Sequence, residues 1–402
     1  MRVLLLCNKS PWPPKEGGPI AMYAMINGML MAGISVKILA LNTNKYAVDL
    51  TDIPEDFKQQ THISFVSIDL SIKPIDAFLN LFTHQSYHVK RFISPDIAAA
   101  LTEILKAEAF DIIQFESLFL TPYIDLIKRY STAQLVLRAH NIEHLIWYRL
   151  AQKTTLPLNK LYLRHLAKTL KSYELSVMNE VDGIAAITHK DEERFRMLGC
   201  TKLVSTIPFG IACPEVIPQK NAILPKTLFH IGSMNWLPNQ EGISWFLKEC
   251  WPLVYLKFPE VRLVLAGREM PHWMLNTVMA GVEIRGEVPD ATQFMRENGI
   301  MIVPLFSGSG VRVKIVEAMA LGKTVIATSI GAEGIMCQHQ KNILLADTPT
   351  GFLDAIISCY TEPGMSEKIG ENARQYIQEY HLLEKVSSTT KNFYQQLIQS
   401  LN

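Results

Sequence analysis

Residues 301–335, MIVPLFSGSGVRVKIVEAMALGKTVIATSIGAEGI, hold the pattern that decides the fold of this 402-residue chain. An apolar run ends in a loop of small residues, 307–310, and the amphipathic helix that follows carries Arg312, Lys314 and Glu317. A second apolar run and another glycine loop come next. Backbone N–H groups at a helix N-terminus attract phosphate, and a carboxylate one turn further along the helix can accept hydrogen bonds from two ribose hydroxyls. The stretch predicts an α/β protein that binds a nucleotide diphosphate.

The same alternation of short apolar runs and helical patterns extends along the whole chain. Runs typical of buried strands lie at residues 3–7, 36–41, 63–68, 111–115, 135–139, 183–187, 204–207, 227–231, 262–266, 282–284, 300–303, 324–327 and 343–345. Helical patterns lie between them, for example at 20–32 and 159–180. This alternation predicts right-handed βαβ units, and so many strands suit two parallel sheets better than one. The predicted fold class is α/β, with two Rossmann-like doubly wound domains that face each other across a cleft.

Prolines mark the boundary between the two domains. Residues 208–226 contain four of them and few helix or strand signals, which is typical of an interdomain linker. We predict a first domain over residues 1–208, a linker over 209–226 and a second domain over 227–381. A terminal helix over 382–402 is expected to pack back on the first domain.

Composition and charge exclude several classes of protein. With 39 basic and 38 acidic residues, the formal net charge of +1 argues against a nucleic-acid binder. The six cysteines are scattered and form no C-x-x-C pair or metal-ligand spacing. No apolar run approaches the roughly 18–20 residues of a membrane-spanning helix, and none has the pattern of a signal peptide. We expect a protein of the cytoplasm.

On these residues the chain resembles the retaining glycosyltransferases of the two-Rossmann architecture called GT-B, specifically family four (glycosyl transferases group 1). The resemblance covers nearly the whole chain. Family members carry a Glu-x7-Glu signature, whose second glutamate matches Glu317 and whose first falls on Ser309. The resemblance implies that Glu317 binds the ribose hydroxyls, and that the second domain binds a nucleotide-sugar donor and the first an acceptor. It also implies contacts to the sugar and phosphates from the backbone amides of Gly308, Ser309, Gly310 and Val311.

A departing nucleoside diphosphate needs positive charge near it. Many relatives carry an arginine and a lysine in the loop that opens the second domain, but here that loop begins Gly232-Ser233 and residues 227–247 contain neither. Gly232 and Ser233 can still offer backbone N–H groups to a phosphate. Arg312 and Lys314 are the predicted catalytic substitutes for the missing cations. Arg268 and Glu333 are two further candidates for nucleotide binding. Each could instead be an ordinary loop residue.

Two motifs of the first domain follow predicted strands. A Gly-Gly pair after a strand, such as Gly17-Gly18, makes only a tight turn in most proteins. The resembling enzymes use a Gly-Gly loop at this place to let the backbone approach the donor and the acceptor. Lys15, just before the pair, can add positive charge. His140 aligns with a family histidine that approaches the sugar and acceptor, so we predict that it lines the reaction centre. Its alternative is a helix cap or a satisfied loop histidine. The order of residues 140–144 is not that of a zinc-binding H-E-x-x-H helix, so no metal is expected.

Two other clusters of residues have simpler structural interpretations. Three tryptophans at helix-like spacing predict a core, namely Trp236, Trp245 and Trp251. A basic cluster on a predicted helix is usually a solvated face, but it could also meet anionic lipid or a lipid-linked acceptor. That cluster consists of Lys160, Arg164, His165, Lys168 and Lys171.

Together these features predict a hexosyltransferase without cofactor or catalytic metal. It would move a sugar from a nucleotide-diphosphate sugar to a glycan, lipid-linked or small-molecule acceptor, in cell-surface polysaccharide or glycoconjugate biosynthesis. It would bind no nucleic acid and could contact a membrane peripherally. Two alternatives stay open: a nucleotide-sugar 2-epimerase of the same architecture, and an inactive relative that binds nucleotide or glycan as a scaffold.

Overall fold

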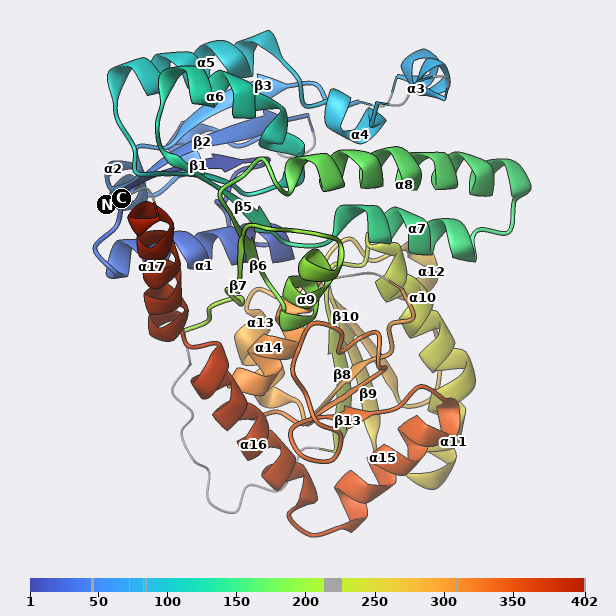
Figure 1. Cartoon of the computed structure of the whole chain (residues 1–402). Coiled ribbons are helices and arrows are strands. Elements are labelled where there is room, and N and C mark those ends of the chain that lie inside the picture. The colour runs from blue at the N-terminus through green and yellow to red at the C-terminus, as the bar shows by residue number, and fades with distance from the viewer. Residues whose placement is uncertain are drawn as a thin grey trace. The chain divides into compact units, whose positions relative to one another are not determined.

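The chain forms two compact units, each built on one parallel sheet (Figure 1). The computed structural model describes residues 1–44, 47–71, 73–81, 83, 85–212, 226–307 and 310–400. The first unit comprises Met1–Gly210 and Leu383–Asn402, and the second comprises Ile211–Leu382. The predicted pair of parallel α/β sheets is confirmed. Most of the predicted linker, residues 213–225, lies outside the described residues.

The sheet of the first unit has seven parallel strands in the order β3-β2-β1-β4-β5-β6-β7. The strands are β1 (Arg2–Cys7), β2 (Ser35–Thr43), β3 (Ser64–Ile68), β4 (Ile112–Phe115), β5 (Gln134–Ala139), β6 (Gly183–Ala186) and β7 (Leu203–Thr206). Strand order reverses between β1 and β4, so the loops after these two strands flank the topological switch point. In open α/β sheets this is where ligands bind.

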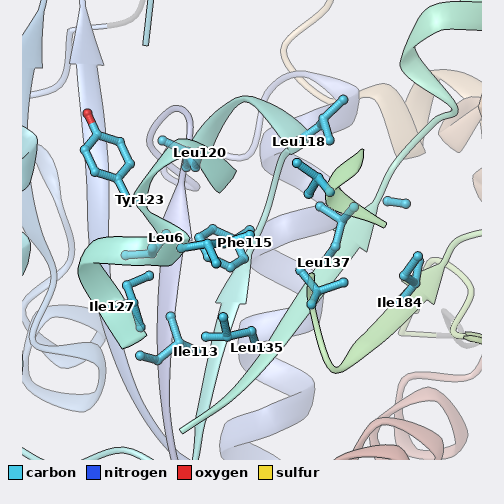
Figure 2. Close-up of a cluster of buried hydrophobic side chains, with 14 of the residues drawn as sticks. Leu6, Ile113, Phe115, Leu118, Leu120, Tyr123, Ile127, Leu135, Leu137 and Ile184 are labelled. Carbon is cyan, nitrogen blue, oxygen red and sulfur yellow. The ribbon is translucent and has the colours of Figure 1, made fainter. Parts of the chain in front are cut away.

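Helices cover both faces of the first sheet. They are α1 (Gly17–Met31), α2 (Glu55–Thr61), α3 (Pro74–Asn80), α4 (Tyr87–Lys90), α5 (Pro95–Ala107), α6 (Ile124–Tyr130), α7 (Glu143–Lys153), α8 (Pro157–Val177), α9 (His189–Met197) and α17 (Leu383–Gln399), with 3-10 turns at Leu50–Asp52 and Leu118–Tyr123. Because successive strand residues point to opposite faces, Leu4 and Leu6 of β1 enter one hydrophobic cluster while Val3 and Leu5 enter another. Figure 2 shows the first of these clusters, centred on Phe115. Burial on both faces explains why β1 is apolar along its length.

The C-terminal helix α17 belongs to the first unit and packs against α1. The two helices lie so close at Gly28 that a Cβ there would be 2.5 Å from Oγ of Ser387. The buried side chains of α17 include Phe393, Tyr394 and Leu397, which belong to the hydrophobic cluster around β1 and β2. The last helix of the chain therefore completes the core that the first strand begins.

The second unit has six parallel strands in the order β10-β9-β8-β11-β12-β13. Its strands are β8 (Thr227–Ile231), β9 (Arg262–Ala266), β10 (Val282–Gly286), β11 (Ile300–Val303), β12 (Val325–Ala327) and β13 (Leu344–Leu345). Its helices are α10 (Leu237–Trp245), a π-helical turn (Phe246–Cys250), α11 (Trp251–Lys257), α12 (His272–Leu275), α13 (Ala291–Glu297), α14 (Val313–Ala320), α15 (Pro349–Thr361) and α16 (Met365–Tyr380). The switch point of this sheet lies between β8 and β11.

One helical prediction differs from the structure. The pattern at 159–180 corresponds to α8, but α8 begins at Pro157 and pairs with α7 in a helical hairpin. The start of α7 was not predicted because it lies within the polar residues 140–144, where apolar residues do not recur at helical spacing. The N–H groups of Glu143 and His144 at that turn are instead satisfied by the carboxylate of Glu174 on α8.

Candidate functional site

The switch point of the second unit brings together most of the residues predicted to bind nucleotide. Gly232 follows β8 directly, and the loop after β11 leads to Arg312 and into α14. Gly310 and Val311 lie in that loop, with Gly310 at φ 75°. Gly308 and Ser309 lie outside the described residues. The N-terminus of α14, a helix end of the kind that favours anions, therefore lies at the carboxyl end of β11.

Lys314, on the first turn of α14, reaches back to the end of β8. Its Nζ lies 2.9 Å from Oδ1 of Asn239 and 3.1 Å from Nε2 of His230. A Cβ placed on Gly232 would be 3.0 Å from the same Nζ. The lysine thus occupies the space beside the Gly232 loop, where the sequence supplies no cation of its own. Two of its three N–H donors bind protein, which leaves one for a ligand.

His230 fixes the direction in which Lys314 donates. It is fully buried on β8, and its Nδ1 lies 2.8 Å from the carbonyl oxygen of Ile302 on β11. A carbonyl can only accept, so Nδ1 carries the proton and Nε2 accepts from Lys314. Burial, with the charge of Lys314 as a second cause, lowers the pKa of His230 well below its usual value. The ring is therefore neutral, and acts as an acceptor that holds the ammonium in place.

Arg312 stands next to this lysine at the start of α14. Its side chain is buried; one guanidinium nitrogen donates to the carbonyl of Gly310 at 2.9 Å, and the guanidinium lies 5.2 Å from the ring centre of Trp236. Burial, with the charge of Arg312 added, lowers the pKa of Lys314 to about 7. Two buried cations placed this close together, one with a lowered pKa, are a feature of sites that bind anions.

The tryptophan prediction is wrong for one of the three residues, because Trp245 packs against the core of the second unit. Trp251 is 1% exposed and belongs to the core, but Trp236 is 36% exposed and provides the surface on which Arg312 stacks. The helix-like spacing failed because α10 begins only after Trp236, at Leu237.

Glu317 lies one turn beyond Lys314 on α14 and makes no ion pair with it. In the described part of the chain its carboxyl has no hydrogen-bond or ion-pair partner, although it is half-buried. Burial raises its pKa to about 7. A carboxyl held without a protein partner beside an anion-receptive helix end is suited to accept hydroxyl groups from a ligand.

Two glycines, Gly267 and Gly242, allow the loops of this site to pack closely. A Cβ on Gly267, whose φ is 156°, would lie 2.0 Å from the carbonyl oxygen of Gly232. A Cβ on Gly242 of α10 would lie 2.1 Å from the carbonyl oxygen of Pro304. Backbone cannot yield to such overlaps as a flexible side chain can, so these glycines set how near the loops after β8, β9 and β11 approach one another.

The remaining predicted residues of this unit surround the same edge of the sheet. Arg268 follows β9 and its Nε lies 3.5 Å from Oε1 of Glu287. The hydroxyl of Ser233 donates to Asn235 at 2.9 Å, and its carbonyl accepts from Nδ2 of Asn239 at 2.8 Å. Glu333 lies in the turn after β12, whose Thr328 hydroxyl bonds to the carbonyl of Leu305 in the loop after β11.

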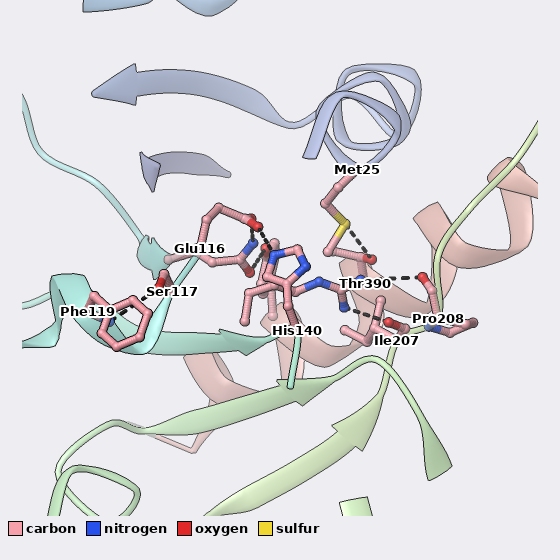
Figure 3. Close-up of polar contacts among 11 residues, drawn as sticks. Met25, Glu116, Ser117, Phe119, His140, Ile207, Pro208 and Thr390 are labelled. Atoms are coloured by element: carbon pink, nitrogen blue, oxygen red, sulfur yellow. Dashed lines mark hydrogen bonds and ion pairs between the residues drawn. The ribbon is translucent and has the colours of Figure 1, made fainter. Parts of the chain in front are cut away.

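The first unit has a polar site at its own switch point, shown in Figure 3. His140 follows β5, and its Nε2 lies 2.9 Å from Oε2 of Glu116, which follows the neighbouring strand β4. Glu116 is 3% exposed. Burial alone would raise its pKa, but the hydrogen bond and charge of His140, with the charge of Arg138, bring that pKa below the usual value. The carboxylate is thus ionised and fixes the imidazole ring.

A buried chain of hydrogen bonds ties this pair to the C-terminal helix. The hydroxyl of Tyr394 on α17 donates to Oε1 of Gln114 at 2.6 Å, and Nε2 of Gln114 donates to Oε1 of Glu116 at 2.5 Å. Arg138, 2% exposed, donates to the carbonyl of Ile207 at 2.6 Å. Every oxygen of the Glu116 carboxylate therefore has a partner, and the network extends from His140 into the core.

A second carboxyl with a shifted pKa belongs to Glu143, the first residue of α7. Burial, with the charge of Glu174 added, raises the pKa of Glu143 to about 8. Glu174 itself accepts from Nδ1 of His144 at 2.6 Å. This hydrogen bond from His144 joins α7 to α8. The carboxyl of Glu143, by contrast, is protonated near neutral pH.

Gly17 and Gly18 start α1 at the carboxyl end of β1. A Cβ on Gly18 would lie 3.0 Å from Cε of Lys9, and Nζ of Lys9 lies 3.7 Å from Oε2 of Glu16. Lys15 is exposed in the preceding loop. The lysine nearest the glycine pair is therefore Lys9, which sequence reasoning did not single out.

Comparison with known proteins now adds the family. Residues 225–362 match the family model Glycosyl transferases group 1. Sucrose-phosphate synthase from Thermosynechococcus elongatus has a similar structure, with a TM-score of 0.72 and 15% identity over 100% of both chains. HepE from Anabaena, solved with UDP, gives a TM-score of 0.68 and 15% identity over 98% of this chain and 100% of that chain. The fold is GT-B. This chain is a glycosyltransferase with a group 1 domain.

A relative matches this glycosyltransferase along nearly its whole length. It is an uncharacterised 44.6 kDa protein in the cps region of Klebsiella pneumoniae, 25% identical over 408 residues, which cover 96% of this chain and 98% of the relative. The match to the family model lies within the second unit, which holds the residues around Lys314.

Within the described ranges, no helix is long and apolar enough to cross a membrane. Over the same residues, no group of three or more His, Cys, Asp or Glu side chains is placed to hold a metal ion.

Besides Lys9, sequence reasoning did not single out Glu116, His230, Asn239 and Glu143. Glu116 could have been found, because a carboxylate directly after a buried strand lies at the ligand-binding edge of a parallel sheet. His230 gave no such signal, since it stands inside an apolar run that is typical of any core strand.

Proposed function

We propose that the chain is a retaining glycosyltransferase that moves a sugar from a nucleotide-diphosphate sugar to a glycan, lipid-linked or small-molecule acceptor. The observation that carries the proposal is the arrangement of Arg312, Lys314 and Glu317 at the switch point of the second unit. Burial and the charge of Arg312 lower the pKa of Lys314, as expected beside a site that receives an anion, and the carboxyl of Glu317 lies one turn away.

The chemistry follows from the charge that develops. As the bond between the anomeric carbon and the diphosphate oxygen breaks, negative charge grows on the leaving diphosphate. Lys314, steered by His230 and Asn239, and Arg312 stabilise that charge. The acceptor oxygen bonds to the anomeric carbon, and its proton passes to the departing phosphate. Glu317 accepts hydrogen bonds from the ribose hydroxyls. These bonds position the nucleotide, and Glu317 does not touch the reacting atoms.

In this proposal the first unit binds the acceptor. His140, held by ionised Glu116, offers its remaining ring atoms to the sugar or to the acceptor hydroxyl. The glycines at the start of α1 let backbone approach the substrates.

The relatives suggest where to look for substrates. HepE was solved with UDP and with UDP-glucose, so UDP is the first nucleotide to test. The Klebsiella relative comes from the cps region, which favours a role in cell-surface polysaccharide biosynthesis.

Thermal shift and calorimetry with UDP, GDP, ADP and CDP test the donor site. We expect one nucleotide to raise the melting temperature, and Glu317→Ala to weaken its binding by more than tenfold. Glu371→Ala, at an exposed position of α16, is the matched control and should bind as wild type does. Unchanged affinity in Glu317→Ala would remove that residue from the site.

Product analysis without an acceptor separates the alternatives. A 2-epimerase would convert the nucleotide sugar to its epimer, a scaffold would leave it untouched, and a transferase would release nucleotide slowly by hydrolysis. Activity should persist in the presence of a chelator, because Lys314 and Arg312 supply the positive charge. Activity lost to the chelator and restored by magnesium would contradict metal independence.

A further inference from the structure

The tip of the α7–α8 hairpin exposes an unusual set of large apolar side chains. Leu156, Leu158 and Leu161 are 62%, 82% and 67% exposed, and Tyr148 and Leu150 at the end of α7 are 51% and 43% exposed. These residues lie together because α7 and α8 run antiparallel and are joined by a short turn. Isolated exposed leucines are ordinary, but a cluster of this kind marks an interaction surface.

The same hairpin is strongly basic. Residues 144–173 contain six Lys and Arg and no Asp or Glu. On α8 the exposed positions Arg164, Lys168 and Lys171 continue the face that Leu161 begins, at spacings of three and four residues. The opposite face of α8, with Leu166 and Leu170, is buried in the unit. The exposed face is therefore apolar at its N-terminal end and cationic along the rest.

A neighbouring helix extends the apolar end. Nε2 of His165 lies 3.2 Å from the carbonyl oxygen of Asn80, the last residue of α3. Ile75 and Leu79 of α3 are 74% and 56% exposed. This contact also corrects the interpretation of His165, which points inward and is not part of the basic face.

We propose that the face formed by residues 148–171 of this hairpin, here called the hairpin face, docks onto an anionic lipid bilayer. The leucines and Tyr148 would enter the boundary between headgroups and acyl chains, and Arg164, Lys168 and Lys171 would contact anionic headgroups. Clustered leucines favour the acyl boundary, and a stretch without a single acidic residue matches a negatively charged surface along its length. The inference does not depend on the proposed glycosyl transfer.

Co-sedimentation of the full chain with lipid vesicles tests the proposal. Vesicles are made of phosphatidylcholine alone or with one third phosphatidylglycerol. We expect partitioning at least tenfold stronger on the anionic vesicles, and weaker at high salt because surface charges are screened. Lys168→Gln with Lys171→Gln should reduce partitioning by roughly tenfold or more, and Leu158→Ser with Leu161→Ser by a similar factor.

Matched variants of the second unit serve as controls. Leu256→Ser removes a leucine that is 85% exposed, and Lys248→Gln with Lys368→Gln removes two exposed charges. Both should partition as wild type does. The proposal is overturned if the chain ignores anionic vesicles, if it binds neutral and anionic vesicles equally, or if the hairpin variants bind like the controls. Nucleotide binding measured on the same variants should not change, so failure here is distinct from failure of the proposed function.

Discussion

Lys314 has its pKa lowered to about 7, first by burial and then by the charge of Arg312. About one pH unit above that value, most of the free protein carries a neutral amine. A bound diphosphate places negative charge beside Nζ and raises the pKa, so binding should take up roughly one proton per nucleotide. Calorimetry in buffers of different ionisation enthalpy measures this uptake.

The control for this experiment removes only the titrating group. Lys314→Met keeps the length of the side chain and should abolish the uptake while weakening binding by tenfold or more. Glu317, with a pKa of about 7, is ionised at this pH before and after binding and adds little. Equal uptake in Lys314→Met would place the titration elsewhere.

Glu116 is a buried carboxylate whose charge compensates that of buried Arg138. Glu116→Gln keeps the shape but leaves that guanidinium without its counter-ion, so we expect the free energy of unfolding to fall by about 3 kcal/mol. The folded pKa lies below the usual one, so this contribution is full above the unfolded pKa and is lost as pH falls through the folded pKa. Urea unfolding at several pH values measures it.

Exposed Glu103→Gln on α5 is the control and should change stability little. A Glu116→Gln protein as stable as wild type at neutral pH, or a difference that grows in acid, would contradict an ionised buried Glu116.

The two sites were predictable to different extents for a physical reason. Arg312, Lys314 and Glu317 lie in one stretch, so helical spacing alone brings them together. The partners of Lys314, by contrast, are His230 and Asn239, which are 84 and 75 residues away in sequence. Only the pairing of β8 with β11 makes them neighbours, and no local pattern encodes which buried polar side chain a strand pairing will bring near.

Strands were easier to predict than helices because the inner strands of both parallel sheets are buried and form short apolar runs, whereas the edge strands β3 and β10 are only partly buried. The hairpin of α7 and α8 was harder. One strong helical period at 159–180 concealed the preceding helix, whose first turn depends on Glu174 of α8 for its hydrogen bonds.

The packing of α10 against the loop after β11 leads to a prediction about whole elements. A Cβ on Gly242 would meet the carbonyl oxygen of Pro304 at 2.1 Å, so Gly242→Ala must push that loop away from the end of β8. We expect a stability loss of about 1–3 kcal/mol and nucleotide affinity reduced by roughly tenfold. Thermal unfolding and calorimetry measure the two effects.

Gly183→Ala provides the matched overpacking variant in the first unit, where a Cβ would lie 2.9 Å from side-chain atoms of Leu397 and Phe393. It should lower stability while leaving nucleotide affinity unchanged. If both variants lose affinity equally, the effect comes from general loosening and the loop after β11 has no special part in binding.

The chain as a whole leaves the first unit at Gly210, forms the second unit, and returns to finish the first with α17. Each unit has its own hydrophobic core, but the core of the first is assembled from both ends of the chain. The first unit therefore needs residues 383–399 to complete its fold, whereas the second unit is complete within one continuous segment.

Ending the chain at Leu382 should therefore unfold the first unit and spare the second. Removal of α17 takes away Val386, Phe393, Tyr394 and Leu397, all buried. At roughly 2 kcal/mol each, their loss amounts to about 8 kcal/mol, which is comparable to the whole stability of a typical domain. Limited proteolysis should digest residues 1–210 rapidly and leave a protected fragment of the second unit that still binds nucleotide. A chain ending at Gln399 keeps all four side chains and should resist as wild type does; equal resistance of the chain ending at Leu382 would mean that the first unit folds without α17.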